Sequence, residues 1–487
     1  MVRRFAANTA FTGYWGAPAL PLGHRQALRQ HRREHGAPAC QNGNMKTHHA
    51  PASIPETITP SVSPERAHAI AASFDLRALP ADFLANPYPA YAALRETEPV
   101  RRMPDGSYFL TRYADLVAVY RDAQTFSSDK HVEFAPKYNV APFGSDTAPS
   151  PLFEHHTTSL VFNDPPLHTR VRRLIMGALT RRAIADMEPG LIQLVDSLLD
   201  DLAARGGGDL IEDFASAIPV EIIGNLLDVP HADRDPLRAW SLAILGALEP
   251  VVTPEQHALG NQSVTEMLDY LRTLVARRRQ SPGDPERDVL TRLIQGEASG
   301  EQLSEVELLQ NCIFLLNAGH ETTTNLIGNG LILLQEFPAA RERLLGELRT
   351  AADAAAQEPI LTLAVDEFLR FESSNQLGNR RALVATTVGG VDLPAGALVT
   401  LCIGAANRDP AQFPDPETLD LGRTPNKHLA FGFGIHQCAG LSLARLEGRV
   451  AIGRFLQRFP DYRLSEAPVR GGRARFRGFL AAPFSVR

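Results

Sequence analysis

This 487-residue chain contains one stretch that decides its fold, Phe431-Gly432-Phe433-Gly434-Ile435-His436-Gln437-Cys438-Ala439-Gly440, which leads into Leu441-Ser442-Leu443-Ala444-Arg445-Leu446-Glu447. Its glycines allow the backbone a tight bulge and a close approach to a flat ligand. Cys438 stands at the entrance to a helix, where unpaired N–H groups and the positive end of the dipole favour a thiolate. Such a thiolate can be the axial ligand of a haem iron. Taken alone, the segment is also compatible with a buried structural cysteine or a phosphate-binding loop.

The chain has only four cysteines, and they lie far apart: Cys40, Cys312, Cys402 and Cys438. This excludes a disulfide-rich scaffold and a zinc cluster built from CxxC pairs, and it indicates a reducing compartment. The composition, with 44% apolar and 21% charged residues and a net charge of −6, is typical of a soluble globular protein. We therefore expect Cys312 and Cys402 to be core residues and Cys438 to be the functional cysteine.

The N-terminal part differs in composition from the rest. Residues 1–50 carry seven basic residues against one acid, Glu34, and they lack the continuous apolar run of a signal peptide. An arginine-rich leader resembles a transit peptide, but residues 1–50 contain no serine. Because a Ser/Thr/Pro-rich linker follows Met45, the native start is expected there, with residues 1–44 an upstream extension. We predict that residues 1–65 form a basic, disordered extension and linker, and that residues 66–487 form one domain.

Helical periodicity dominates the predicted domain. The predicted helices span residues 86–96, 114–122, 167–204, 218–227, 236–247, 262–278, 286–295, 304–337, 339–352, 363–372 and 439–458. A hairpin is predicted over 100–113, turning at Pro104-Asp105-Gly106, and short strands over 384–388, 391–393 and 398–403. No convincing linker follows residue 65, so the pattern predicts a single large, mainly α domain with small β-sheets, although the length alone suggests about three domains. No segment is apolar enough to span a membrane.

The longest predicted helix carries Ala318-Gly319-His320-Glu321-Thr322-Thr323 at its centre. It opens with a capping box, Ser304 and Glu307, and stops before Pro338. Small residues let a flat cofactor lie against the helix, and a threonine hydroxyl competes for the carbonyl four residues back and opens the helix locally. An acid beside an alcohol in a buried helix indicates a functional site.

Two further pairs are weak signals by themselves. His168 and Arg172 lie at i, i+4 behind a predicted N-cap, Asp164, and can point together at an anion, or form a solvated basic face. Glu367 and Arg370 lie at i, i+3, which alone describes a routine surface pair.

Together, these segments resemble the cytochrome P450 superfamily over roughly residues 80–487. The pattern Phe431-x-x-Gly434-x-x-x-Cys438-x-Gly440 is similar to its haem-binding signature, and the other motifs follow in the family's order. The resemblance implies the cytochrome P450 fold, with haem between a long central helix and a C-terminal cysteine loop. It also implies haem b as the cofactor, with Cys438 as the axial thiolate.

The resemblance also implies roles for individual residues. Thr322 hydrogen-bonds the dioxygen and Glu321 relays protons. Glu367 and Arg370 hold a later arginine, with Arg423 the first candidate and Arg408 the second. Arg380 is expected to contact a propionate, with Arg381 as the neighbouring alternative. The full set of expected haem contacts is His168, Arg172, Ala318, Gly319, Arg380, Phe431, Gly432, His436, Cys438 and Gly440.

The implied function is a haem-dependent monooxygenase that inserts one oxygen atom of O2 into a small apolar substrate. Electrons are expected from a separate ferredoxin- or flavodoxin-type donor with its reductase, because only 49 residues follow Cys438. A basic run, Arg170, Arg173, Arg181 and Arg182, is a candidate docking surface. The alternatives are a peroxide-driven peroxygenase and a non-catalytic haem or gas-binding protein. A cytoplasmic protein without a membrane anchor or nucleic-acid function is expected.

The candidate substrate pocket is mainly apolar, which favours a terpenoid, aromatic or lipid-like molecule. Its predicted positions are Phe134, Tyr138, Phe143, Phe153, Leu160, the segment 240–252, Leu315, Leu316, Ala318, Gln376, Leu377 and Phe479. Lys130, His131, His155 and His156 could hold a carboxylate, or face solvent. The resemblance departs at Ser373-Ser374-Asn375, where relatives often have a proline.

Overall fold

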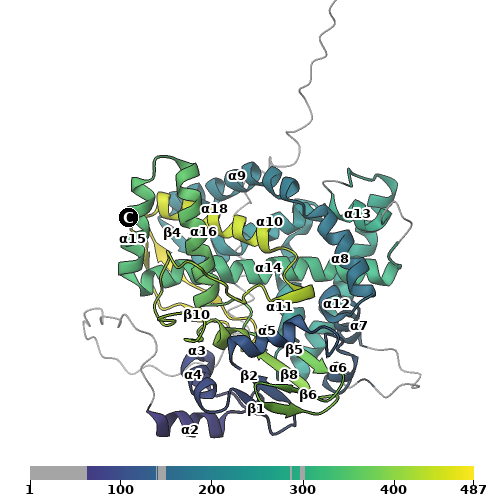
Figure 1. Cartoon of the computed structure of the whole chain (residues 1–487). Coiled ribbons are helices and arrows are strands. Elements are labelled where there is room, and N and C mark those ends of the chain that lie inside the picture. The colour runs from purple at the N-terminus through teal and green to yellow at the C-terminus, as the bar shows by residue number, and fades with distance from the viewer. Residues whose placement is uncertain (1–62, 139, 141–149, 286–287, 297–301, 487) are drawn as a thin grey trace, which may run out of the picture. The chain divides into compact units, whose positions relative to one another are not determined.

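Helices surround one long central helix, and a small sheet lies at one end of the fold (Figure 1). The computed structural model describes residues 63–138, 140, 150–285, 288–296 and 302–486. These residues belong to a single unit. The predictions for residues 1–62 therefore lie outside the described residues. The first described helix begins at Pro64, two residues before the predicted domain boundary, and Ser63 caps it.

The helices confirm the mainly α prediction. They are α2 (Pro64–Ser73), α3 (Ala81–Ala85), α4 (Tyr88–Thr97), α5 (Tyr113–Arg121), α6 (His131–Lys137), α7 (Pro151–Thr158), α8 (Leu167–Ala178), α9 (Arg181–Arg205), α10 (Ala217–Leu226), α11 (Asp235–Gly246), α12 (Pro254–Gln280), α13 (Val289–Gln295), α14 (Glu305–Glu336), α15 (Pro338–Thr350), α16 (Ala354–Phe371), α17 (Ile403–Ala406) and α18 (Leu441–Arg458). Short helical turns are η1 (Leu160–Phe162), η2 (Leu210–Ala215), η3 (His231–Asp233) and η4 (Gly434–His436).

The strands form small sheets. They are β1 (Val100–Arg102), β2 (Tyr108–Leu110), β3 (Phe126–Ser127), β4 (Gly207–Asp209), β5 (Leu377–Ala382), β6 (Thr386–Val388), β7 (Val391–Leu393), β8 (Leu398–Cys402), β9 (Arg463–Leu464), β10 (Val469–Arg470), β11 (Phe479–Ala481) and β12 (Pro483–Ser485). The largest sheet has the order β1-β2-β8-β5-β3. The predicted hairpin is its β1–β2 edge, where Val100 pairs with Leu110.

Helix α14 forms the centre of the helical part, packed against α10, α11, α12, α16 and α18. Its predicted capping box is present, since the Glu307 N–H donates to Ser304 Oγ at 3.2 Å and the Ser304 N–H to Glu307 Oε2 at 2.8 Å. Pro338 begins α15 directly after it. Both ends of α14 therefore follow from the local sequence. The capping box satisfies backbone N–H groups at the start of the helix, and Pro338 has no N–H with which to continue it.

Several predicted boundaries were wrong. The single helix predicted over 167–204 is two helices, because Thr180 caps a new helix by accepting from the Ala183 N–H at 3.1 Å. Asp164 does not cap α8 with its side chain, since that carboxylate accepts from the Ser128 N–H at 2.8 Å and from Ser127 Oγ. Helices α12 and α16 begin earlier than predicted, at caps on Thr253 and Asp353. Strand β5 was missed because its polar residues obscure the apolar–polar alternation that predicts a strand.

Candidate active site

Most predicted site residues line one cavity of about 340 Å³ between α14 and the cysteine loop. Those that line it are Arg172, Ala318, Gly319, Thr322, Arg380, Phe431, Gly432, His436, Cys438 and Gly440. His168, Glu321 and the proposed brace residues Glu367, Arg370 and Arg423 are not among its lining. The cavity therefore joins the cysteine loop to the central helix, as the motif order suggested.

The cysteine loop is shaped by its glycines. Gly432 and Gly434 have φ values of 64° and 72°, in the left-handed region that glycine favours. A Cβ on Gly434 would lie 2.2 Å from the backbone oxygen of Tyr120, so α5 approaches too closely for any side chain. The Cys438 N–H donates to the Phe431 carbonyl oxygen at 2.8 Å, which closes the loop. Cys438 is thereby held on the cavity wall, three residues before α18 begins.

Opposing effects act on the pKa of the Cys438 thiol. Burial raises its pKa, and the Gly440 N–H and the guanidinium of Arg172 lower it. The helix-end effect expected from sequence therefore acts in the predicted direction, but burial outweighs it. Cys312 and Cys402 are buried and outside the cavity lining, and burial raises the pKa of each to about 12.

The middle of α14 presents Ala318 and Thr322 to the cavity. Thr322 Oγ1 donates to the Ala318 carbonyl oxygen at 2.8 Å, which is the predicted back-bond, but the helix remains continuous from Glu305 to Glu336. The expected local opening is therefore absent. Gly319 also makes room for α10, since a Cβ there would lie 2.9 Å from Cδ1 of Ile223.

Glu321 points away from the cavity. Its Oε1 lies 3.5 Å from Arg473 Nη1 and 3.4 Å from Asn325 Nδ2. Burial raises the pKa of this carboxyl, and Arg473 opposes that rise. Adjacent residues in a helix are rotated by about 100°. Glu321 and Thr322 therefore occupy different faces, and the acid does not line the space next to the alcohol.

A cationic and imidazole cluster lies beside Cys438. The rings of His168 and His436 have centroids 4.1 Å apart, and Arg172 Nη2 donates to the Gln437 carbonyl oxygen at 2.7 Å. Arg380 extends from β5 into the cavity wall, whereas its neighbour Arg381 is absent from the lining because successive strand residues face opposite sides. Burial and nearby cations lower the pKa of His436 to about 2.

This cluster has unused donors. Both ring nitrogens of His168 and Nε2 of His436 are buried and have no hydrogen-bond partner among the described residues. Unsatisfied buried polar atoms indicate a missing partner. Two arginines and two such imidazoles fit the two carboxylates of a haem. The donor set therefore suits the cofactor that the cysteine loop implies.

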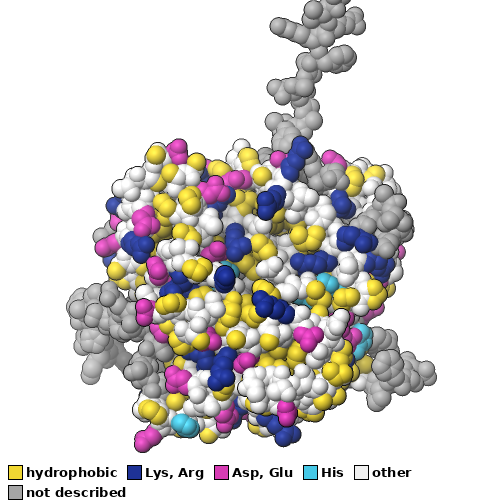
Figure 2. Space-filling model, in the orientation of Figure 1, with side chains coloured by type: hydrophobic (Ala, Val, Ile, Leu, Met, Phe, Trp, Pro, Cys, Tyr) yellow, Lys and Arg dark blue, Asp and Glu magenta, His cyan; other side chains and the backbone are white. Residues whose placement is uncertain are grey.

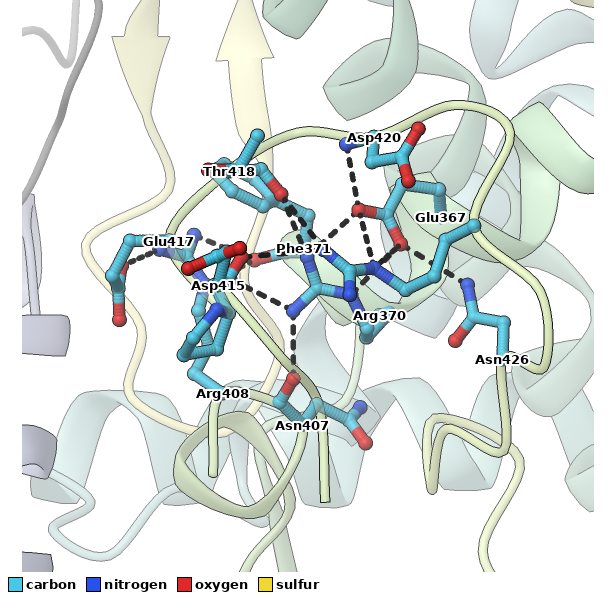
Figure 3. A network of polar contacts seen from close by, with 12 residues as sticks. Glu367, Arg370, Phe371, Asn407, Arg408, Asp415, Glu417, Thr418, Asp420 and Asn426 are labelled. Atoms are coloured by element: carbon cyan, nitrogen blue, oxygen red, sulfur yellow. Dashed lines mark hydrogen bonds and ion pairs between the residues drawn. The ribbon is translucent and has the colours of Figure 1, made fainter. Parts of the chain in front are cut away.

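Glu367 lies at the centre of a fully buried ion-pair network (Figure 3). Arg370 donates from Nε and Nη2 to its two carboxylate oxygens, each at 2.8 Å, and the Asp420 N–H donates to Oε1 at 2.9 Å. Arg423, the first candidate from sequence, places Nε 3.2 Å from Oε2. Arg408, the second candidate, instead donates to the Phe371 carbonyl oxygen and pairs with Glu417. The network fastens α16 to the chain that precedes the cysteine loop.

The predicted substrate positions divide into two groups. Phe134, Leu160, Leu315, Leu377 and, from the segment 240–252, Leu245 and Leu248 line the cavity. Tyr138, Phe153, Leu316, Gln376 and Phe479 are absent from the lining, and Phe143 lies outside the described residues.

The polar loop residues also divide. Lys130, His155 and His156 are buried and line the cavity, whereas His131 is exposed and bonds Asp129. Sequence reasoning missed Asn317 and Arg475, which also line it, as do Ser374 and Asn375. Asn317 directly precedes the motif that begins at Ala318, and this position was the sequence signal that could have identified it as a cavity residue. Ser374 Oγ donates to the Thr322 carbonyl oxygen at 2.8 Å, so the departure at 373–375 contacts the motif itself.

No helix among the described residues is both long and apolar enough to cross a bilayer. In the same part of the chain, no three His, Cys, Asp or Glu side chains gather in a way that could hold a metal ion.

Comparison with known proteins indicates the same family as the residues of the site. The cytochrome P450 family model matches residues 244–464. Cytochrome P450 107B1 of Saccharopolyspora erythraea is 36% identical over 399 residues, 81% of this chain and 93% of that protein. The vitamin D(3) 25-hydroxylase of Pseudonocardia autotrophica is 38% identical over 389 residues, 79% and 89% of the two chains.

The fold agrees as well. The crystal structure of P450BioI, in complex with an acyl carrier protein ligated to hexadec-9Z-enoic acid, is similar with a TM-score of 0.75 and 31% identity. The match covers 84% of this chain and 99% of that one. From sequence, fold and site alike, this chain belongs to the cytochrome P450 family, and it is a monooxygenase whose cofactor is haem b with an axial thiolate.

Proposed function

We propose that this monooxygenase inserts one oxygen atom of O2 into a small apolar molecule held in the cavity beside Cys438. The observation that carries the proposal is that Cys438 and Thr322 line a single, mainly apolar cavity together with Arg172, Arg380 and His436. Apolar walls exclude water from the reacting groups and bind a hydrophobic substrate.

In this proposal, the thiolate of Cys438 would hold the haem iron. Arg172 and Arg380 would balance the charge of the propionates, and His168 and His436 would donate hydrogen bonds to them. When bound, the haem supplies the reductive activation of O2. Thr322 holds a hydroxyl at the cavity wall, where it is available to O2 and to a proton.

Proton delivery to this wall involves Glu321. Its carboxyl keeps its proton more readily than usual, because burial raises its pKa. Since it faces Arg473 instead of the cavity, it reaches Thr322 only through a side-chain rotation or through water. Glu321 is therefore proposed as a relay set back from the reacting groups.

Electrons are proposed to come from a separate ferredoxin- or flavodoxin-type protein with its reductase. The proposed docking surface for this donor is the basic run Arg170, Arg173, Arg181 and Arg182. Arg170 is engaged, since its Nη1 donates to the Gln302 carbonyl oxygen and its Nη2 to Glu307. Arg181 and Arg182 are exposed at the start of α9, which packs against α18.

The ligand assignment is tested by the spectrum of the reduced protein with carbon monoxide. Thiolate ligation by Cys438 is expected to give a Soret band shifted strongly to the red, and Cys438→Ala is expected to abolish that band. Cys312→Ala, which removes a buried cysteine outside the cavity lining, is the matched control and is expected to retain it. A red-shifted band in Cys438→Ala would remove Cys438 from this role.

The peroxide-driven alternative is tested with the same protein. Product formation with an electron donor and O2, and little with peroxide alone, is expected for a monooxygenase. Efficient turnover with peroxide alone would favour the peroxygenase.

A further inference from the structure

The cavity has a polar end that the proposed haem contacts do not use. His155 and His156, on α7, line it and are both buried. Their ring centroids are 5.1 Å apart. Asn317, on α14, lines the same cavity, and neither atom of its amide has a hydrogen-bond partner among the described residues. Buried polar atoms without partners are costly, so a partner from outside the chain is expected.

The hydrogen bonds fix which nitrogen of His156 carries the proton. Tyr138 Oη donates its single proton to the Ala247 carbonyl oxygen at 2.9 Å, because a carbonyl can only accept. Its 2.8 Å contact with His156 Nδ1 therefore requires Nδ1 to donate. In the neutral ring, Nε2 is then an acceptor with a free lone pair. That Nε2 is buried without a partner among the described residues.

His155 is fixed in the same way. Gln310 Nε2 contacts the Glu154 carboxylate at 3.4 Å, so Gln310 Oε1 is the atom that faces His155 Nδ1, at 3.0 Å. An amide oxygen only accepts, so Nδ1 of His155 donates and its Nε2 is left as an acceptor. Both rings are neutral, because burial lowers the pKa of His155 to about 4 and that of His156 well below its ordinary value.

The side chains around His155 and His156 determine which chemical group of a ligand can bind there. A carboxylate has no proton to give to an imidazole acceptor. The cations that act on the His156 ring are Lys137 and Arg475, and both are engaged. Lys137 donates to the Glu249 carbonyl oxygen at 2.7 Å, and Arg475 donates to the carbonyl oxygens of Leu248 and Leu377 and to Asn379. Lys130, which also lines the cavity, pairs with Glu133 at 2.7 Å. An ammonium group would be repelled by Lys130 and Arg475, which line the same cavity. A neutral hydroxyl can donate to an imidazole and accept from an amide.

We propose that the unpartnered Nε2 of His156, beside the neutral ring of His155, accepts a hydrogen bond from a hydroxyl group of an apolar substrate. The monooxygenase would then act on a molecule that already carries an alcohol, placed after a reaction that installs one. This inference rests on the proposed function, and it changes the class of substrate from a hydrocarbon or acid to an alcohol. The carboxylate that Lys130, His155 and His156 suggested in the sequence is not favoured by this geometry.

The test compares three probes of equal chain length: decan-1-ol, its methyl ether and decanoic acid. Their binding to the haem-loaded protein is measured by calorimetry, which needs no turnover. The alcohol is expected to bind about tenfold more tightly than the ether, as one net hydrogen bond provides. His156→Phe, which removes the accepting nitrogen, is expected to reduce this preference. His131→Phe, which removes an exposed histidine outside the cavity lining, is the matched control and is expected to retain it.

Equal affinities for alcohol and ether in the unmodified protein would overturn the subsite, even if the variants fail to fold. Tightest binding of decanoic acid would also overturn it and would assign the polar end to a carboxylate. The carbon monoxide spectrum of the same samples tests the proposed function separately. A normal red-shifted band with no preference for the alcohol rejects only the subsite, whereas loss of the band in the unmodified protein rejects the proposed function.

Discussion

Thr322 and Thr324 make the same local hydrogen bond on α14 but have different surroundings. Thr322 Oγ1 donates to the Ala318 carbonyl oxygen at 2.8 Å, and Thr324 Oγ1 donates to that of His320 at 3.0 Å. Only Thr322 lines the cavity. A role in handling O2 therefore predicts different results for the two substitutions, whereas a purely helical role predicts similar ones.

We expect Thr322→Ala to lower the fraction of reducing equivalents recovered in product and to raise the release of hydrogen peroxide. The reason is that its hydroxyl is the alcohol presented to O2 in the proposed function. NAD(P)H consumption, product and peroxide are measured together with the redox partner present. Thr324→Ala is the control and should leave the ratio unchanged. Equal coupling in both variants would contradict the assignment.

Glu447 is a buried acid on α18 that lines the cavity. Its Oε2 has no hydrogen-bond partner among the described residues, and burial raises the pKa of its carboxyl to about 8. A group with a raised pKa binds its proton more tightly in the folded state than in the unfolded state. Folding stability is therefore highest below the ordinary range of a glutamate, and it falls as the pH rises toward 8.

We expect Glu447→Gln to be more stable than the unmodified protein at pH 8, by on the order of 2–4 kcal/mol, with little difference near pH 4.5. The amide has nearly the same shape and avoids a buried charge. Denaturant unfolding at several pH values measures the difference. Glu466→Gln, at an exposed position, serves as the control and should show no such trend. A difference that stays constant with pH would show that the carboxyl of Glu447 does not titrate as proposed.

At the scale of elements, Glu367 joins α16 to the irregular chain between β8 and the cysteine loop. Its carboxylate accepts from Arg370, Arg423, Asn426 Nδ2 and the Asp420 N–H. Arg370 in turn donates to the carbonyl oxygens of Asn407, Pro416 and Thr418. Backbone that lacks a sheet or helix is thereby held by side chains, which keeps the loop before Cys438 in place.

We expect Glu367→Gln to cost about 3–5 kcal/mol of folding stability, because two buried guanidinium groups lose their counter-charge. Loss of haem is expected to follow, measured as the fraction of protein that gives the red-shifted carbon monoxide band. Glu358→Gln is the matched control on the same helix, since Glu358 is exposed and pairs with Arg449 at 2.6 Å. If both variants retained equal stability, the network would not brace the loop.

At the scale of the whole molecule, charge is distributed without one dominant patch on the face shown in Figure 2, where basic and acidic side chains are interspersed. On α18, Arg449, Arg454 and Arg458 pair with acids on α9. Arg173, Arg181 and Arg182 are the exposed members of the predicted basic run, and Arg181 and Arg182 are its two residues on α9.

We expect Arg181→Glu combined with Arg182→Glu to slow reduction by an acidic ferredoxin by about tenfold at low salt, with a smaller effect at high salt. Opposite charges steer the encounter, and salt screens them. Stopped-flow reduction under carbon monoxide measures the rate. Arg272→Glu on α12, where the arginine is exposed and pairs with Asp269, tests for a general effect of charge. An unchanged rate and salt dependence in the double variant would exclude this surface.

Features that depend on residues close together in the chain were predictable from the sequence. The capping box of α14, the β1–β2 hairpin and the cysteine loop each depend on hydrogen bonds or backbone angles within a few positions. The fold class also followed, because periodicity reports which face of an element is buried. The motif order over the chain was enough to name the family that the relatives then confirmed.

Only the tertiary structure decided how these pieces meet. Helical rotation and packing turn Glu321 toward Arg473, and strand alternation selects Arg380 over Arg381 for the cavity wall. The polar end formed by His155 and His156 on α7 depends on α14, about 150 residues away, through the bond to Gln310, and on the bonds to Tyr138 and Ala247. Local sequence determines which groups are present and how each element begins and ends. Which groups face the same cavity depends on long-range packing, because burial and hydrogen-bond partners come from distant parts of the chain.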